Sequence, residues 1–166
     1  MAPRSTIAGC KWNGSTLPQP SDHHDSLTAL PNRRLLDDRL QQALHLAQRR
    51  DKGVALVLIE LAAFAGVDQA TLREAAQRLG SGLRKADTLA RCGASEFAIV
   101  LTDVRGEPEC RLVVERLVRA LDMDAAIGIS LFPADAGDSA ALMRNANAAR
   151  ERARQLGSRH YRFYAR

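Results

Sequence analysis

An arginine and an aspartate stand three residues apart at Arg84 and Asp87. A guanidinium can donate paired hydrogen bonds to a phosphate or to the acceptor edge of a base, and a carboxylate accepts hydrogen bonds from N–H donors. Together the two groups could hold a polar, anionic ligand. The same spacing also suits a plain ion pair at the surface near the end of a helix, which would contribute little stability. These residues alone leave both interpretations open.

A second group of polar residues surrounds a glycine. Glu60 lies near the end of an apolar run, and Ser95 and Glu96 follow Gly93 and Ala94. Mg²⁺ prefers charged carboxylate oxygens and is usually held by one or two of them. Ser95 offers only a neutral hydroxyl, so this group is a poor magnesium site.

Length and composition indicate one domain with a hydrophobic core, because the chain has 166 residues of which 46% are hydrophobic. The formal net charge of +5 favours an anionic ligand. General nucleic-acid binding is not expected, since only 4% of the residues are aromatic and no stacking platform accompanies the charge. The three cysteines, Cys10, Cys92 and Cys110, show no paired spacing, which argues against a disulfide framework or a zinc site.

No apolar run approaches the roughly 18 residues that a membrane span requires, so we expect a soluble, cytoplasmic protein without a membrane partner. Residues 1–22 contain scattered proline, glycine and small polar residues with no lasting period. This composition predicts a flexible N-terminal tail or linker.

Four segments have the apolar spacing of one helical face. The first helix is expected to start after Pro31 and Asn32, and the second to run from Asp68 to near Gly80 to Gly82. The third is expected to start near Pro108, and the fourth to run from Asp138 or Ser139 to near Gln155.

The remaining apolar runs predict strands. Val54 to Leu61 reads as a central strand that is covered on both faces. Asp87 to Arg91 and Glu96 to Leu101 read as a β-hairpin, for which Gly93 and Ala94 suggest a two-residue turn of the primed type. Ala125 to Phe132 and a short edge strand at Tyr161 to Tyr164 complete the set. The order predicts an α/β (α+β) domain with a mixed sheet and a ferredoxin-like βαββαβ core.

Several separated segments resemble one family. Gly93 to Phe97 reads Gly-Ala-Ser-Glu-Phe and resembles the Gly-Gly-Asp-Glu-Phe signature of the diguanylate cyclase family, the GGDEF domain. His24 to Arg33 resembles the Asp-x-Leu-Thr-Gly-Leu-Pro-Asn-Arg opening of that family, with Ala29 in place of glycine. Ala146 to Gly157 resembles its last helix. The resemblance implies the palm-like fold of nucleotidyl cyclases and one degenerate GGDEF domain over residues 23–166.

The resemblance also implies that the catalytic site is degenerate. Active members use metal ions to join two GTP molecules, and they take one carboxylate from the end of the first strand and another from the third signature position. Glu60 and Ser95 stand at these places, beside Ala94 and Glu96. The segment that reads guanine in active members is missing after Phe64. We therefore expect no catalytic residues, no enzyme activity and no metal or other cofactor; Mg²⁺ would be expected only if cyclase activity survives.

A binding site of the family is better preserved. Arg84 and Asp87 stand at the offset of the Arg-x-x-Asp inhibitory site, which binds the product cyclic di-GMP, and Arg116 resembles a third contact. Arg154 is a possible phosphate contact, although Arg154 and the neighbouring arginines Arg150, Arg152 and Arg159 could simply cover a solvated helix face. The resemblance predicts an inactive receptor for cyclic di-GMP in bacterial second-messenger signalling. The alternatives are a nucleotide-free module that contacts a signalling protein, and a residual cyclase rebuilt around Glu60, Ser95 and Glu96.

Overall fold

A computed structural model describes residues 22–61, 66–157 and 159–165 of the chain. The expected tail therefore lies outside the described residues, except for Asp22. The described part contains four helices and five strands in the order α1 (Arg33–Arg50), β1 (Gly53–Leu61), α2 (Gln69–Ser81), β2 (Thr88–Arg91), β3 (Glu96–Val104), α3 (Glu107–Leu121), β4 (Ala125–Phe132), α4 (Ser139–Gln155) and β5 (His160–Phe163).

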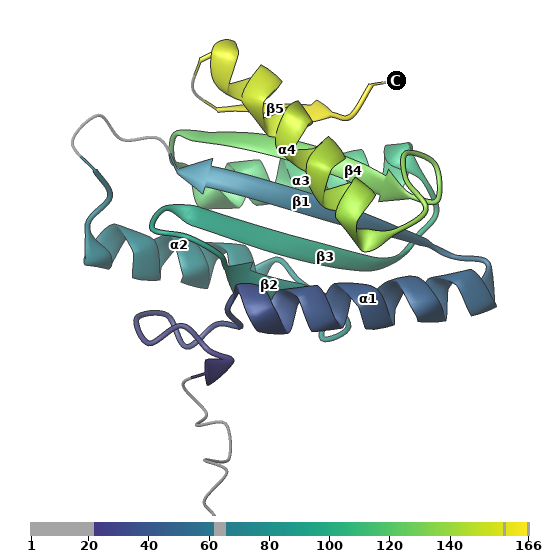
Figure 1. The fold of residues 1–166 in the computed structure, drawn as a ribbon. Coiled ribbons are helices and arrows are strands. Elements are labelled where there is room, and N and C mark those ends of the chain that lie inside the picture. Colours follow the sequence, from purple (N-terminus) through teal and green to yellow (C-terminus); the bar gives the residue numbers. More distant parts are fainter. Residues whose placement is uncertain (1–21, 62–65, 158, 166) are drawn as a thin grey trace, which may run out of the picture.

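The strands form one sheet in the order β2-β3-β1-β4-β5 (Figure 1). β1 pairs antiparallel with β3 and with β4, whereas β4 and β5 are parallel. The predicted mixed sheet, the central position of β1 and the βαββαβ order from β1 to β4 are confirmed. The predicted edge strand also forms, as β5.

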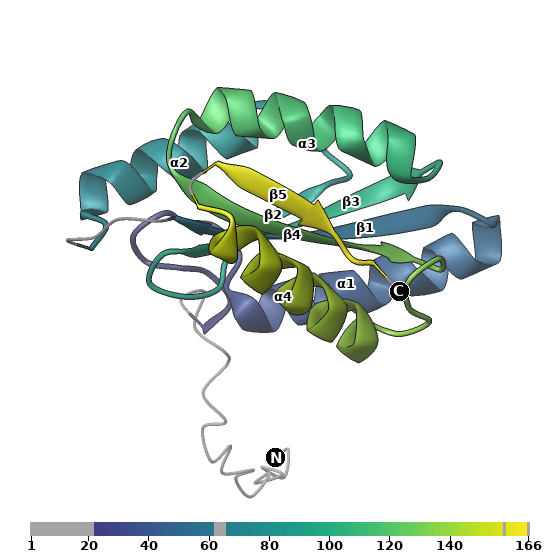
Figure 2. The ribbon, with the colours of Figure 1, turned by 90° about the horizontal axis from the view of Figure 1, so that it is seen from above.

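Helices cover both faces of the sheet (Figure 2), with α2 and α3 on one face and α1 and α4 on the other. Each pair closes its own hydrophobic core. Residues such as Leu79 and Leu117 pack with Ile99 in the first, and Leu40 packs with Leu56 in the second. Because both faces are covered, the apolar residues of β1 are buried from Val54 to Ile59. In the part of the chain that the structure describes, no helix is long and apolar enough to cross a membrane.

Side-chain caps explain where three of the helices begin. The side chains of Asn32, Asp68 and Asp138 each accept a hydrogen bond from the backbone N–H three residues later. The predicted start of a helix at Asp68 is confirmed, and Asp68 is its N-cap. α2 consequently starts soon after β1, and only residues 62–65 between them lie outside the description.

The predicted two-residue turn in the hairpin is wrong. The backbone N–H of Cys92 donates to the carbonyl of Glu96 over 2.9 Å, which leaves the three residues 93–95 in the loop. A primed turn would need a positive φ at Gly93, and Gly93 is not among the described glycines that have one. Glycine permits that conformation without requiring it, so the dipeptide alone did not determine the loop length.

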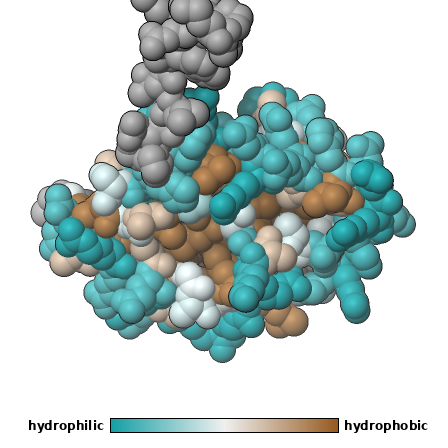
Figure 3. Space-filling view, turned by 90° about the horizontal axis from the view of Figure 1, so that it is seen from below, coloured by the Kyte–Doolittle hydropathy of each residue, from teal (hydrophilic) through white to brown (hydrophobic). Residues whose placement is uncertain are grey.

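The segment that precedes α1 covers part of the outer edge of β2. The backbone N–H of Arg91 donates to the carbonyl of Pro31 over 2.9 Å, and His24 forms an isolated bridge with Pro31. β2 is the edge strand on the lower side of the sheet in Figure 1. Seen from below, this side of the molecule has hydrophobic residues in the middle of the face and hydrophilic residues around them (Figure 3).

Candidate functional site

The end of β1 and the start of β3 bring the expected acidic residues together. Glu60 and Glu96 are direct partners across the two antiparallel strands. The backbone N–H of Leu61 donates to the carbonyl of Ser95 over 2.9 Å, so the hairpin loop is held beside the end of β1. The Glu60 and Glu96 side chains are 26% and 39% exposed. The structure thus brings Glu60, Ser95 and Glu96 together at one end of the sheet.

An arginine from α4 lies against both carboxylates. The Nη1 atom of Arg150 is 3.1 Å from Oε1 of Glu96, and its Nε atom is 3.8 Å from Oε2 of Glu60. The side chain of Arg150 is only 13% exposed. α4 can approach this closely because Gly128 faces it: a Cβ atom at Gly128 would lie 2.1 Å from the carbonyl oxygen of Ala146 and 2.3 Å from the nitrogen of Arg150.

The sequence interpretation of Arg150 as part of a solvated face is not what the structure shows. The buried residues of α4 include Ala146, Ala149 and Ala153. Arg150 follows Ala146 by four positions, which puts it on the border of the buried face. The helical register thus carried a signal for its inward position, but the basic run around it suggested solvent exposure.

Arg154 lies on the same side of α4 but is more open. Its Nη1 atom is 3.9 Å from Oε1 of Glu60 and its Nη2 atom is 3.3 Å from Oε2 of Glu151, while 61% of the side chain is exposed. A phosphate could still reach it in competition with these two carboxylates. Ser158, which the family resemblance aligns with a phosphate-binding arginine, lies outside the described residues.

The residues around Glu60 and Glu96 do not fit a Mg²⁺ ion. Ser95 brings no charge, and the guanidinium of Arg150 is already paired with both carboxylates. Among the described residues, no group of three or more histidine, cysteine, aspartate or glutamate side chains is arranged to hold a metal ion.

Cys92, which precedes the hairpin loop, is not poised as a nucleophile. Burial raises the pKa of its thiol to about 11, so the thiol stays protonated at neutral pH. Burial likewise raises the pKa of Cys110 to about 12. Both of these cysteines are free.

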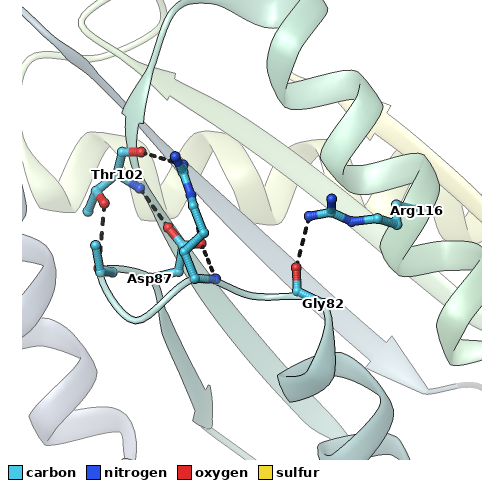
Figure 4. A network of polar contacts seen from close by, with 6 residues as sticks. Gly82, Asp87, Thr102 and Arg116 are labelled. Atoms are coloured by element: carbon cyan, nitrogen blue, oxygen red, sulfur yellow. Dashed lines mark hydrogen bonds and ion pairs between the residues drawn. The ribbon is translucent and has the colours of Figure 1, made fainter.

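The loop between α2 and β2 carries the second predicted site (Figure 4). The carboxylate of Asp87 accepts from the backbone N–H of Arg84 over 3.0 Å and from that of Thr102 over 3.2 Å. Only 3% of the Asp87 side chain is exposed. The carboxylate therefore holds the loop against β3, and in this conformation it does not reach a ligand at the surface.

The two arginines of this site are exposed. Arg84 donates from Nη2 to the carbonyl of Thr102 over 3.0 Å, its Nε atom lies 3.6 Å from Oδ2 of Asp87, and 58% of its side chain is exposed. Arg116 extends from α3 toward the same loop and donates to the carbonyl of Gly82 over 2.9 Å (Figure 4). The structure thus brings the three predicted residues to one loop, with the ion pair formed and two guanidinium groups at its surface.

A third polar cluster was not identified from the sequence. Nη1 of Arg91 lies 2.8 Å from Oδ1 of Asp25, and its Nη2 donates to the carbonyl of Ala94 over 3.0 Å. Burial alone would raise the pKa of Asp25, but hydrogen bonds from Thr28 and the charge of Arg91 outweigh it and hold the pKa below its usual value. The cluster ties the segment before α1 to the hairpin loop. Asp25 and Arg91 are 66 positions apart, and no local pattern pointed to their contact.

Comparison with known proteins identifies the family. Residues 22–160 match the family model described as "Diguanylate cyclase, GGDEF domain". The chain is 36% identical to the bifunctional diguanylate cyclase/cyclic di-GMP phosphodiesterase MucR of Pseudomonas aeruginosa, over 85% of this chain and 23% of MucR. The chain thus spans about a quarter of the length of that relative.

Solved structures show the same fold. A structure of TpbB from Pseudomonas aeruginosa that comprises only its GGDEF domain aligns with a TM-score of 0.81 and 27% identity, over 86% of this chain and 95% of that one. The GGDEF domain of DgcB from Caulobacter crescentus, solved in complex with c-di-GMP, aligns with a TM-score of 0.76 and 20% identity, over 92% of this chain and 99% of that one. The chain therefore belongs to the GGDEF domain family of the diguanylate cyclases.

Proposed function

We propose that this chain is a catalytically inactive GGDEF domain that binds cyclic di-GMP through Arg84 and Arg116. The observation that carries the proposal is the presence of two exposed guanidinium groups, each held by a backbone carbonyl beside one loop. Each of these hydrogen bonds uses one of the five N–H donors of its guanidinium, so further donors remain for a ligand. The contacts orient the arginines before a ligand arrives, which reduces the entropy lost on binding.

The ligand chemistry suits these groups. Cyclic di-GMP carries two phosphates and two guanines, and the O6 and N7 atoms of a guanine accept paired hydrogen bonds from arginine. The net charge of +5 adds a favourable long-range attraction for a dianion. The DgcB domain, solved with c-di-GMP, shows that a protein of this fold can hold the dinucleotide.

Asp87 acts in this proposal as a positioning residue. Its carboxylate fixes the loop through the backbone N–H groups of Arg84 and Thr102. A direct contact between Asp87 and a guanine, as the family resemblance implies, would require the loop to open.

A calorimetric titration with cyclic di-GMP tests the binding half of the proposal. Arg84→Ala and Arg116→Ala should each weaken binding by at least about tenfold, because each removes a charge-assisted hydrogen-bond donor. Arg144→Ala is the matched control, since Arg144 is an exposed arginine on α4 and away from the loop. No binding to the wild type, or equal binding to all four proteins, would remove the proposal.

The inactivity rests on the neutral Ser95 and on the arginine that pairs with Glu60 and Glu96. Two carboxylates that grip a metal are needed to offset the charge on the phosphates and to lower the pKa of the attacking hydroxyl. Incubation of the purified chain with GTP and either Mg²⁺ or Mn²⁺ should yield no cyclic di-GMP. Detection of the dinucleotide, lost in Glu60→Gln, would show that the site is a working cyclase.

A further inference from the structure

Glu60 and Glu96 form a pair of like charges that requires compensation. Residues directly opposite on antiparallel strands have their Cβ atoms about 5 Å apart, and like charges at two such positions destabilise the strand pairing. Both side chains are partly buried at the edge of the hydrophobic core, where the repulsion is screened less than at an open surface. A cation near both carboxylates would remove this repulsion.

Arg150 occupies the place of that cation. Its guanidinium lies 3.1 Å from Glu96 and 3.8 Å from Glu60, and its backbone is fixed by the close contact of α4 with Gly128. Glu96 and Arg150 also line a small cavity of about 20 Å³ together with Leu36 of α1 and Leu58 of β1. The guanidinium is thus held near both carboxylates by α4, whose position is fixed by its close contact with Gly128.

A divalent ion would find the carboxylates of Glu60 and Glu96 already paired with Arg150, and the positive charge of Arg150 would repel it. Glu60 and Glu96 would have to leave Arg150, and the guanidinium, at 13% exposure, would remain nearby as an uncompensated cation. We propose that Arg150 is a built-in counter-ion of Glu60 and Glu96, which takes the place that a metal ion would need beside these carboxylates. The folded chain then needs no Mg²⁺ or Mn²⁺ at this place, and it excludes both ions.

The test measures Mn²⁺ binding by electron paramagnetic resonance in the absence of GTP. The wild type should bind no Mn²⁺ in a manner that depends on Glu60. Arg150→Leu, which keeps much of the side-chain volume and removes the charge, should bind Mn²⁺ at least about tenfold more tightly than the wild type. Addition of Glu60→Gln to Arg150→Leu should abolish the gain, and Arg144→Leu on the same helix should behave as the wild type.

Thermal unfolding gives a second readout. Without metal, Arg150→Leu should melt below the wild type, and Mn²⁺ should raise its Tm while leaving that of the wild type unchanged. Mn²⁺ binding by the wild type that Glu60→Gln removes would overturn the proposal. The same holds for a folded Arg150→Leu variant whose Mn²⁺ binding equals that of the wild type.

Arg150→Leu could fail to fold because two carboxylates lose their counter-ion. The triple variant Arg150→Leu/Glu60→Gln/Glu96→Gln decides that case, since it removes all three charges together and should recover the folded state. Failure of the triple variant to fold would overturn the counter-ion role. Mn²⁺ binding is measured without nucleotide, so its outcome is separate from those of the cyclic di-GMP titration and the GTP assay.

Discussion

At the scale of single residues, Asp87 shows how a residue of the family motif can be used by the fold itself. Its carboxylate satisfies two backbone N–H groups and is nearly inaccessible. Asp87→Ala should destabilise the domain by about 1–3 kcal/mol, because the backbone N–H groups of Arg84 and Thr102 lose a charged acceptor. Urea unfolding would measure the change. Asp38→Ala, which alters an exposed aspartate of α1, should stay within about 0.5 kcal/mol of the wild type.

The ion pair between Asp25 and Arg91 predicts a pH dependence. Burial opposes the shift, yet the hydrogen bonds from Thr28 and the charge of Arg91 lower the pKa of Asp25 below the unfolded value of 3.8. A lowered folded pKa contributes stability that is present above the unfolded pKa and is lost as the pH falls through the folded pKa.

The free energy of unfolding of Asp25→Asn should therefore be lower than that of the wild type at about pH 6, and the difference should shrink as the pH falls below 3.8 through the lowered pKa. Urea unfolding at a series of pH values would measure the difference between the two proteins. A difference that stays constant over this range would show that the charge of Asp25 does not contribute.

The residues that sequence reasoning missed are those whose role depends on distant partners. Arg84, Asp87 and Arg116 were identified because they stand at the offsets of a family motif, and the structure brings them to one loop. Arg150 pairs with residues 54 and 90 positions before it, and its own neighbourhood is a basic helix surface. Short patterns predict local chemistry, whereas a contact made by tertiary packing becomes visible only in the folded chain.

At the scale of elements, the approach of α4 to β4 depends on Gly128. A Cβ atom there would overlap backbone atoms of Ala146 and Arg150, which cannot move aside as a flexible side chain could. Gly128→Ala should therefore destabilise the domain by about 1–3 kcal/mol or more, because α4 must shift off the sheet. Thermal unfolding would measure the loss.

Gly137→Ala is the matched control for this change. A Cβ atom at Gly137 would meet nothing within 4 Å. Its Tm should therefore stay near that of the wild type. Similar losses in both variants would mean that the close approach at Gly128 is not the cause.

Apolar periodicity predicted the helices and strands well because most of them bury one or both faces. The three N-caps were also readable, since an aspartate or asparagine before an apolar helical stripe is a local signal. The length of the hairpin loop, in contrast, was not predicted from the sequence. Its length follows from the register of β2 on β3, in which Arg91 faces Phe97, and a glycine at its tip is compatible with several loops.

At the scale of the whole molecule, ligand binding should change the stability of the entire domain. A ligand that binds only the folded state raises the free energy of unfolding by about 2.7 kcal/mol at a hundred times its Kd. For a domain of this size, saturating cyclic di-GMP should therefore raise the Tm by roughly 5–10 °C. Differential scanning fluorimetry would measure the shift, and Arg84→Ala should reduce it.

GTP at the same concentration serves as the control for general nucleotide effects. A Tm that cyclic di-GMP leaves unchanged would favour the alternative of a module that keeps the fold to contact another protein.

The sequence predicted the molecule best at this scale: the order of elements and the family resemblance both pointed to the sheet, its two helical layers and the GGDEF fold.

The segment before α1 has a consequence for how the protein behaves in concentrated solution. An unpaired strand at the margin of a sheet is a template on which a neighbouring chain can add its own backbone and begin to aggregate. The carbonyl of Pro31 already accepts the N–H of Arg91, and β2 is only four residues long. The family's opening motif thus occupies part of this margin, so fewer backbone groups remain there for a neighbouring chain to pair with.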